Sequence, residues 1–215
     1  MKMKARNKIL LLALCMAALI AVSVIGTMAY LTSTAEVTNT FTVGDISIDL
    51  YEHNYIKDSN TLGTTEVNSV SDYKILPGVD LPKDPTVKVT ANSEPCWLFI
   101  KIEDDKWPTA TGTDGKKKIN YELADGWTPL DEHSGVYYKE LSTETTDKTY
   151  PVIKDNKVTV SSELTKGDID SFKNTHTDGT FTLKITAYAI QKDNTISSAT
   201  IAWDTLMQTY SNTNP

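Results

Sequence analysis

The residue types that most often carry catalysis are sparse in this 215-residue chain. It has three histidines, at positions 53, 133 and 176. No two of them have the i, i+4 spacing that places two zinc ligands on one helix face. His53 and His133 each follow an acidic residue, but neighbouring residues on a strand point to opposite faces. We therefore expect surface histidines, and the sequence predicts no catalytic residue and no metal site.

Other chemical motifs are also missing. There is no Gly-x-Ser-x-Gly nucleophile elbow and no glycine loop of the Walker or dinucleotide type. The acidic pair Asp104 and Asp105 falls well short of the roughly six to eight oxygens that calcium takes. The pattern calls for neither an enzyme nor a cofactor.

The N-terminus has the three-part layout of a secretory signal. Positive residues between positions 2 and 8 precede an apolar run from Ile9 to Ile25, and small residues follow at Thr27 and Ala29. We expect cleavage after Ala29, which makes Tyr30 the new N-terminus of a secreted protein with no stable membrane span. The alternative is a membrane anchor that is not cleaved. The length of the apolar run is near the lower limit of the roughly 17–25 residues that a membrane-spanning helix needs.

Cleavage would leave a strongly acidic chain. It removes four of the 21 basic residues and no acidic ones, so 17 basic residues face 28 acidic ones and the net charge becomes −11. This balance argues against binding nucleic acid or anionic lipid through bulk electrostatics.

Cleavage would also remove Cys15 and leave Cys96 as the single cysteine. A lone extracellular cysteine can be a free thiol or an intermolecular link. Because Cys96 opens the apolar run that continues to Ile102, we favour core packing for it.

Alternation of apolar and polar residues predicts many short strands. Half-buried strands are expected at 35–43, 46–50, 87–91, 119–123 and 181–189, a strand buried on both faces at 96–102, and short strands at 136–138 and 157–160. The apolar phase flips at Gly44 and Asp45, which suggests a bulge or bend. Helices are expected at 196–210, and at 161–172 with Ser161 or Ser162 as cap. Residues 52–74 are polar and irregular, which favours a long surface excursion.

This pattern predicts a mainly β protein: a single-domain β-sandwich of jelly-roll type with one or two short helices. The expected organisation is a signal peptide over 1–29, an N-terminal segment over 30–43 and the sandwich over 44–215.

The segment that cleavage would expose, Tyr30 to Val43, is prone to extended structure. It contains no proline or glycine and one charged residue, Glu36. Such segments pair readily with exposed sheet edges. It can be an ordinary first strand of its own sheet or a strand added to a neighbouring molecule, and the residues alone leave both readings open.

Several stretches resemble the TasA/camelysin family of secreted Gram-positive proteins. The resemblance covers both ends and part of the middle of the chain, with residues 52–74 and 104–180 less clearly matched. It rests on Gly26–Thr32, Asn39–Leu50, Leu76–Gly78, Lys83–Val89, Leu183–Gln191 and Ala202–Trp203.

The resemblance implies a jelly-roll subunit of extracellular biofilm-matrix fibres, released by a dedicated signal peptidase of the SipW type with Thr27, Ala29 and Tyr30 at the processing site. It also implies that the N-terminal segment of one subunit complements the sheet of the next, which is a copy of itself or a related fibre subunit. The residues expected to bind that partner are Tyr30, Leu31, Ala35, Val37, Asn39 and Phe41.

Two alternatives belong to other classes. Camelysin-like members have been described as surface metalloproteases, but this sequence has no matching motif. A monomeric cell-surface binding module could use Trp97, Trp107, Trp127 and Trp203 for stacking, although Trp97 and Trp203 lie in patterns typical of a core. Metal binding with peptide cleavage, or polymerisation that depends on concentration, would separate these functions.

Overall fold

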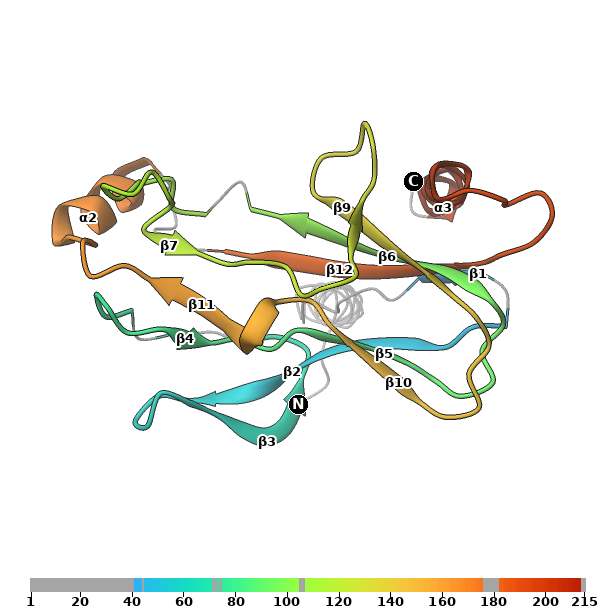
Figure 1. The fold of residues 1–215 in the computed structure, drawn as a ribbon, viewed down its shortest axis with the longest axis horizontal. Coiled ribbons are helices and arrows are strands. Elements are labelled where there is room, and N and C mark those ends of the chain that lie inside the picture. Colours follow the sequence, from blue (N-terminus) through green and yellow to red (C-terminus); the bar gives the residue numbers. More distant parts are fainter. Residues whose placement is uncertain are drawn as a thin grey trace, which may run out of the picture. The chain divides into compact units, whose positions relative to one another are not determined.

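A computed structural model describes residues 41–43, 45–70, 73, 75–104, 107–175 and 182–213. The expected signal peptide and residues 30–40 lie outside this part of the chain. The described part is mainly β, as predicted, with three sheets and few helices (Figure 1). The helical segments are the 3₁₀ turn η1 (Lys154–Asn156), α2 (Lys166–Thr175) and α3 (Ala199–Thr213).

The largest sheet has five strands in the order β1-β12-β6-β9-β8. Neighbouring strands are antiparallel except for the parallel pair of β1 and β12. The bounds are β1 Phe41–Val43, β12 Lys184–Gln191, β6 Cys96–Glu103, β9 Val136–Leu141 and β8 Thr128–Pro129.

Two smaller sheets are antiparallel throughout. One has the order β10-β5-β2-β3 and the other the order β4-β11-β7. Their bounds are β10 Lys148–Pro151, β5 Thr86–Val89, β2 Ile48–Ile56, β3 Thr61–Val67, β4 Leu81–Pro82, β11 Lys157–Val160 and β7 Ile119–Asn120.

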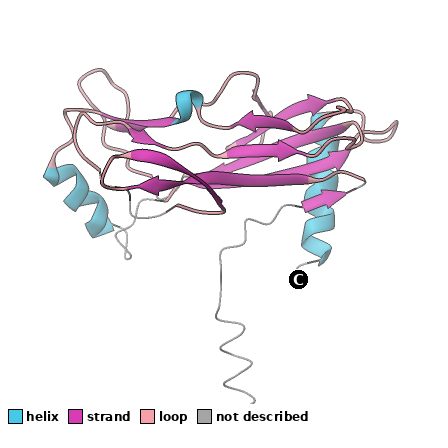
Figure 2. Ribbon diagram, turned by 90° about the horizontal axis from the view of Figure 1, so that it is seen from below, coloured by secondary structure: helices cyan, strands magenta, loops and turns pink. Residues whose placement is uncertain are grey.

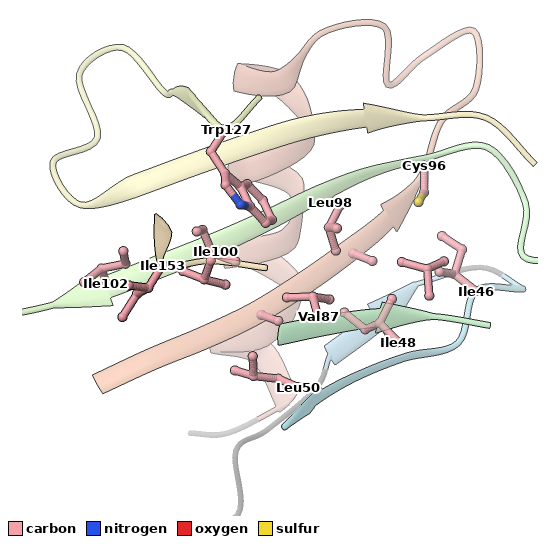
Figure 3. Packing of buried hydrophobic residues seen from close by; sticks show 14 residues of the cluster. Ile46, Ile48, Leu50, Val87, Cys96, Leu98, Ile100, Ile102, Trp127 and Ile153 are labelled. Carbon is pink, nitrogen blue, oxygen red and sulfur yellow. The ribbon is translucent and has the colours of Figure 1, made fainter. Parts of the chain in front are cut away.

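The main core lies between the five-stranded and four-stranded sheets. Alternate residues of β2 and β5, such as Leu50 and Val87, pack in one buried cluster with Leu98 and Ile100 of β6 (Figure 3). Cys96 belongs to the same cluster, so the predicted core role of this cysteine is confirmed. Burial also raises the pKa of its thiol to about 11, which keeps it protonated and unreactive at neutral pH.

Strand β6 is buried on both faces, as its continuous apolar run predicts. Its other face carries Trp97 and Phe99, which pack with Trp203 and Leu206 of α3 in a second cluster. Figure 2 shows α3 lying against the strands near one end, away from α2. Helix α3 therefore covers the outer face of the five-stranded sheet.

The phase flip after β1 marks a change of sheet. β1 belongs to the five-stranded sheet, whereas β2 begins at Ile48 in the four-stranded sheet. Ile46 and Ile48 then both enter the core between the sheets. The predicted bend is thus the crossover that changes which sheet the chain follows.

The prediction of irregular structure over 52–74 is wrong for most of its length, although most of its described residues are exposed or half-buried. β2 continues to Ile56 and forms a hairpin with β3. The ladder is irregular between His53 and Tyr55, and there the Asn54 side chain accepts a hydrogen bond from the Thr65 amide at 3.1 Å. A Cβ on Gly63 would lie 2.3 Å from Asn54 Oδ1, so this glycine makes room for the bulge. Because this hairpin lies at a sheet edge and carries many exposed polar residues, it lacks the alternation of apolar and polar residues that predicts a strand.

Helix α2 begins later than predicted, and its cap is Thr165 rather than Ser161 or Ser162. The Asp168 amide donates to Thr165 Oγ1 at 3.2 Å, and the Thr165 amide donates to Asp168 Oδ2 at 2.8 Å. This reciprocal pair satisfies two amides at the helix start. Helix α3 also begins after its predicted start at Ile196, with the Ile201 amide donating to Ser198 Oγ at 3.3 Å.

Asp168 gives a pH-dependent prediction. Hydrogen bonds from the Thr165 hydroxyl and from Lys118 lower the pKa of Asp168 from 3.8 to about 2. A lowered folded-state pKa stabilises the protein above the unfolded pKa, and this stabilisation is lost as pH falls through the folded value. We expect Asp168→Asn to lower the midpoint of urea unfolding at pH 7, and the difference from wild type to shrink between about pH 4 and pH 2.

The matched control is Asp170→Asn, which removes an exposed i, i+4 pair with Lys166 on the same helix. Such pairs contribute little, so its unfolding midpoint is expected to stay near wild type. A constant difference between Asp168→Asn and wild type across the acid range would contradict the prediction.

Substitution of two glycines by alanine distinguishes the cost of backbone strain from the cost of a steric clash. Gly135 and Gly115 both have φ of +76°, but a Cβ on Gly135 would lie 2.5 Å from the Ile102 carbonyl oxygen, whereas one on Gly115 meets nothing within 4 Å. We expect Gly115→Ala to cost about 1–2 kcal/mol from the left-handed conformation alone. Gly135→Ala should cost roughly 1–3 kcal/mol more because the backbone must shift. Equal losses in urea unfolding would contradict the proposed contact.

Candidate functional site

The predicted partner-binding segment meets the described structure only at its C-terminal end. Thr27, Ala29, Tyr30, Leu31, Ala35, Val37 and Asn39 lie outside the described residues. Phe41 is described, and it opens β1. β1 pairs in parallel with β12, so that Phe41 lies opposite Tyr188, Thr42 opposite Ala189 and Val43 opposite Ile190. The end of this segment therefore lies in a sheet of its own chain.

Strand β12 is longer than β1, the strand that pairs with it at the edge of the sheet. β12 runs from Lys184 to Gln191, and its whole length pairs with β6 on one side. On the other side, β1 covers only Tyr188–Ile190. Within the described residues, no strand pairs with Ile185–Ala187 on that side. A backbone edge of this kind can accept a further extended segment.

Strand β12 is packed on both faces of its sheet. The Tyr188 ring meets Trp203 edge-on at 5.4 Å between ring centroids, and Tyr210 of the same helix at 6.4 Å. Ala187 and Ala189 are buried in the core on the other face of the sheet. This packing on both faces constrains the position of the β12 edge.

Most other sheet edges in the described part are short or carry proline, features that discourage strand addition. β4, β7 and β8 have two residues each, and Pro82, Pro129 and Pro151 lie in β4, β8 and β10. β3 is the exception, a seven-residue edge strand. In the described part, the edges on which a partner can add therefore include β3, the uncovered part of β12, and Lys139–Leu141 of β9 on the side where β8 pairs only with Tyr137 and Tyr138.

A polar cluster lies where β2 approaches the start of β5. Lys83 Nζ lies 2.7 Å from Glu52 Oε1, and both side chains are nearly buried. Beside them, His53 Nδ1 lies 2.6 Å from Asp84 Oδ2, and the His53 amide donates to Asp84 Oδ1 at 3.0 Å. Lys83 and Asp84 belong to the Lys83–Val89 stretch of the family resemblance, but the sequence did not indicate that they pair with Glu52 and His53.

The histidine prediction needs correction at His53. Its side chain is 33% exposed and bonded to a buried carboxylate, so it is a tertiary contact rather than a plain surface residue. His133 lies 3.8 Å from the exposed Asp204 carboxylate, and His176 lies outside the described residues. Across the described chain, no three His, Cys, Asp or Glu side chains gather as metal ligands.

All four tryptophans are buried, with 4–8% of each residue exposed. Three indole N–H groups donate to backbone carbonyls: Trp97 to Ile196 at 3.1 Å, Trp107 to Ile119 at 2.9 Å and Trp127 to Pro151 at 2.9 Å. These rings are therefore core residues and do not provide the exposed stacking surface considered for a binding module.

None of the helices in the described ranges has the length and apolar content needed to cross a membrane. Comparison of the chain with protein-family models, curated proteins and solved structures gives no match.

Proposed function

We propose that this protein is a secreted structural subunit that assembles into extracellular fibres through its N-terminal strand. A signal peptidase of the SipW type removes residues 1–29 during export, and Tyr30 becomes the mature N-terminus. The partner is the next copy of the chain or a related subunit in the biofilm matrix of a Gram-positive bacterium.

The pairing of β1 with β12 is the observation that supports this proposal most. β1 is a three-residue edge strand joined to its own sheet by one parallel ladder. Parallel pairing is slightly less stable per residue than antiparallel pairing, and in the described part of the chain three residue pairs join β1 to β12. A strand held by so few residue pairs can separate from β12 of its own chain and pair with β12 of a neighbouring molecule.

The register suggests how the donor would lie. Continued toward the N-terminus, it places Asn39 opposite Thr186 and Thr38 opposite Ile185, along the part of β12 that β1 leaves uncovered. Main-chain hydrogen bonds would hold the donor, and alternate residues such as Val37 and Phe41 would supply specificity.

Such a contact joins different surfaces of the two subunits. The donor leaves from the N-terminus, whereas the acceptor is the edge of β12. A head-to-tail contact that does not close on itself yields a filament. We further propose that the two facing sheets, with a shared core between them, form a sandwich of jelly-roll type.

The test compares blocked and free N-termini of one protein. A chain beginning at Tyr30 is produced behind a cleavable bulky fusion partner, and electron microscopy and light scattering follow it before and after cleavage. We expect particles of subunit size before cleavage and filaments afterwards, above a threshold concentration. Cleaved protein that stays monomeric at every concentration would overturn the proposal. N-terminal sequencing of the exported protein checks that it begins at Tyr30.

A further inference from the structure

Lys83 and Glu52 form a buried pair between two separate parts of the chain. Lys83 precedes β5 and Glu52 lies on β2, 31 positions earlier. Their side chains are only 10% and 12% exposed, and Lys83 Nζ lies 2.7 Å from Glu52 Oε1. Because Oε1 is bonded to the carboxyl carbon Cδ, this contact brings the amine close to the atom it would attack, and such positioning favours reaction between the two groups.

Two polar atoms in this cluster have no described hydrogen-bond partner. They are the other carboxyl oxygen, Glu52 Oε2, and the hydroxyl of Tyr73, and both are buried. The lysine ammonium lies 5.6 Å from the centre of the Tyr73 ring, which stacks on Tyr55 at 4.6 Å. Orphaned buried polar atoms are rare in native proteins and call for an explanation.

Burial changes the chemistry open to this pair. Condensation requires a neutral amine and a carboxylic acid, and one proton passed from the ammonium to the carboxylate across the 2.7 Å contact would supply both. Enclosure also keeps out the water that would reverse the reaction. The oxygens of the neighbouring Asp84 are engaged by His53, which leaves Glu52 as the acceptor.

We propose that Lys83 and Glu52 condense to an amide, so that the side chains form an intramolecular isopeptide cross-link. The lone pair of the neutral Lys83 amine forms a bond to Glu52 Cδ, and the bond between Cδ and Oε2 breaks. Oε2 leaves with the acid proton and one amine proton as a single water molecule. No oxidant or reductant is needed, since the carboxyl and amide carbons have the same oxidation state.

Tyr73 adds a buried hydroxyl and an aromatic ring beside the lysine. Burial, followed by the charge of Glu52, raises the pKa of the Tyr73 hydroxyl far above its ordinary value. The hydroxyl therefore stays protonated and keeps its hydrogen-bond donor. The resulting amide would tie β2 to the segment before β5, whether or not the protein forms fibres.

The test is mass spectrometry of the full chain as it is expressed, after prolonged incubation in the folded state. A proteolytic digest is expected to contain one branched peptide joining Glu52 to Lys83, lighter by one water than its two parts. Lys83→Arg keeps a positive charge but lacks the primary amine, and its Glu52 peptide should be linear and of full mass.

An internal control lies nearby. Lys157 Nζ is 3.0 Å from Asp80 Oδ2, but these side chains are 44% and 41% exposed, so both should appear only in linear peptides. Linear Glu52 and Lys83 peptides of full mass in the wild-type digest would overturn the proposal, as would loss of water at any other pair.

Discussion

Protein that begins at Asp45 stays monomeric under conditions in which protein that begins at Tyr30 forms filaments. The shorter chain lacks β1 and the whole donor segment, so nothing remains to add to the β12 edge of a neighbour. Light scattering and electron microscopy should show complete loss of polymerisation, the largest effect that the proposed assembly predicts.

The shorter chain must remain folded for this comparison to be meaningful. β1 contributes three residue pairs at one sheet edge, whereas the main core is built from β2, β5, β6 and β12. We therefore expect thermal unfolding of the Asp45 protein to remain cooperative. A third chain beginning at Phe41 keeps β1 but lacks the rest of the donor, and it should also fail to polymerise. Filaments of normal length from the Asp45 chain would contradict strand donation.

Phe99→Ala is expected to cause the largest loss of stability among the substitutions considered. Phe99 is fully buried between β6 and α3, with its ring 5.3 Å from that of Trp203 and 6.2 Å from that of Tyr138. Truncation leaves a cavity under the helix, and such changes cost about 3–5 kcal/mol. Urea unfolding followed by tryptophan fluorescence measures the loss.

Ile201→Ala is the matched control, because this residue lies on α3 but is 45% exposed. It should change the free energy of unfolding by about 0.5 kcal/mol or less. Similar losses for the two variants would mean that α3 does not pack on the sheet through Phe99.

The sequence predicted best those elements whose apolar pattern is set by burial. β6 is a continuous apolar run because it has a core on both faces. The alternation around Val87 and Val89 predicted β5 equally well, because one face of this strand packs in the main core. In these strands, the spacing of apolar residues along the sequence shows directly which faces of the strand are buried.

Edge elements were harder to predict because burial constrains them less. β3 is exposed or half-buried at every position, so its residues carry little apolar periodicity. The late start of α2 depends on the reciprocal bonds between Thr165 and Asp168, and several serines and threonines nearby could have served as caps.

Tertiary pairs were beyond the reach of sequence pattern. Glu52 with Lys83, and His53 with Asp84, are each 31 positions apart and meet only because β2 pairs with β5. A similar limit applied to the N-terminal segment. Its strand character was readable from composition, but the partner of β1, strand β12, lies 147 positions further along the chain at Phe41 and Tyr188.

The most direct test of strand donation uses two single-cysteine substitutions in separate chains. Thr42 lies opposite Ala189 in the β1–β12 ladder, so chains carrying Thr42→Cys are mixed with chains carrying Ala189→Cys, each beginning at Tyr30 and lacking the native thiol through Cys96→Ser. If the strand of one subunit occupies the β12 edge of the next, oxidation during assembly gives disulfide-linked dimers containing one chain of each kind. Filaments that form from the mixture without such dimers, while a chain carrying both substitutions closes its own disulfide, would contradict strand donation at β12.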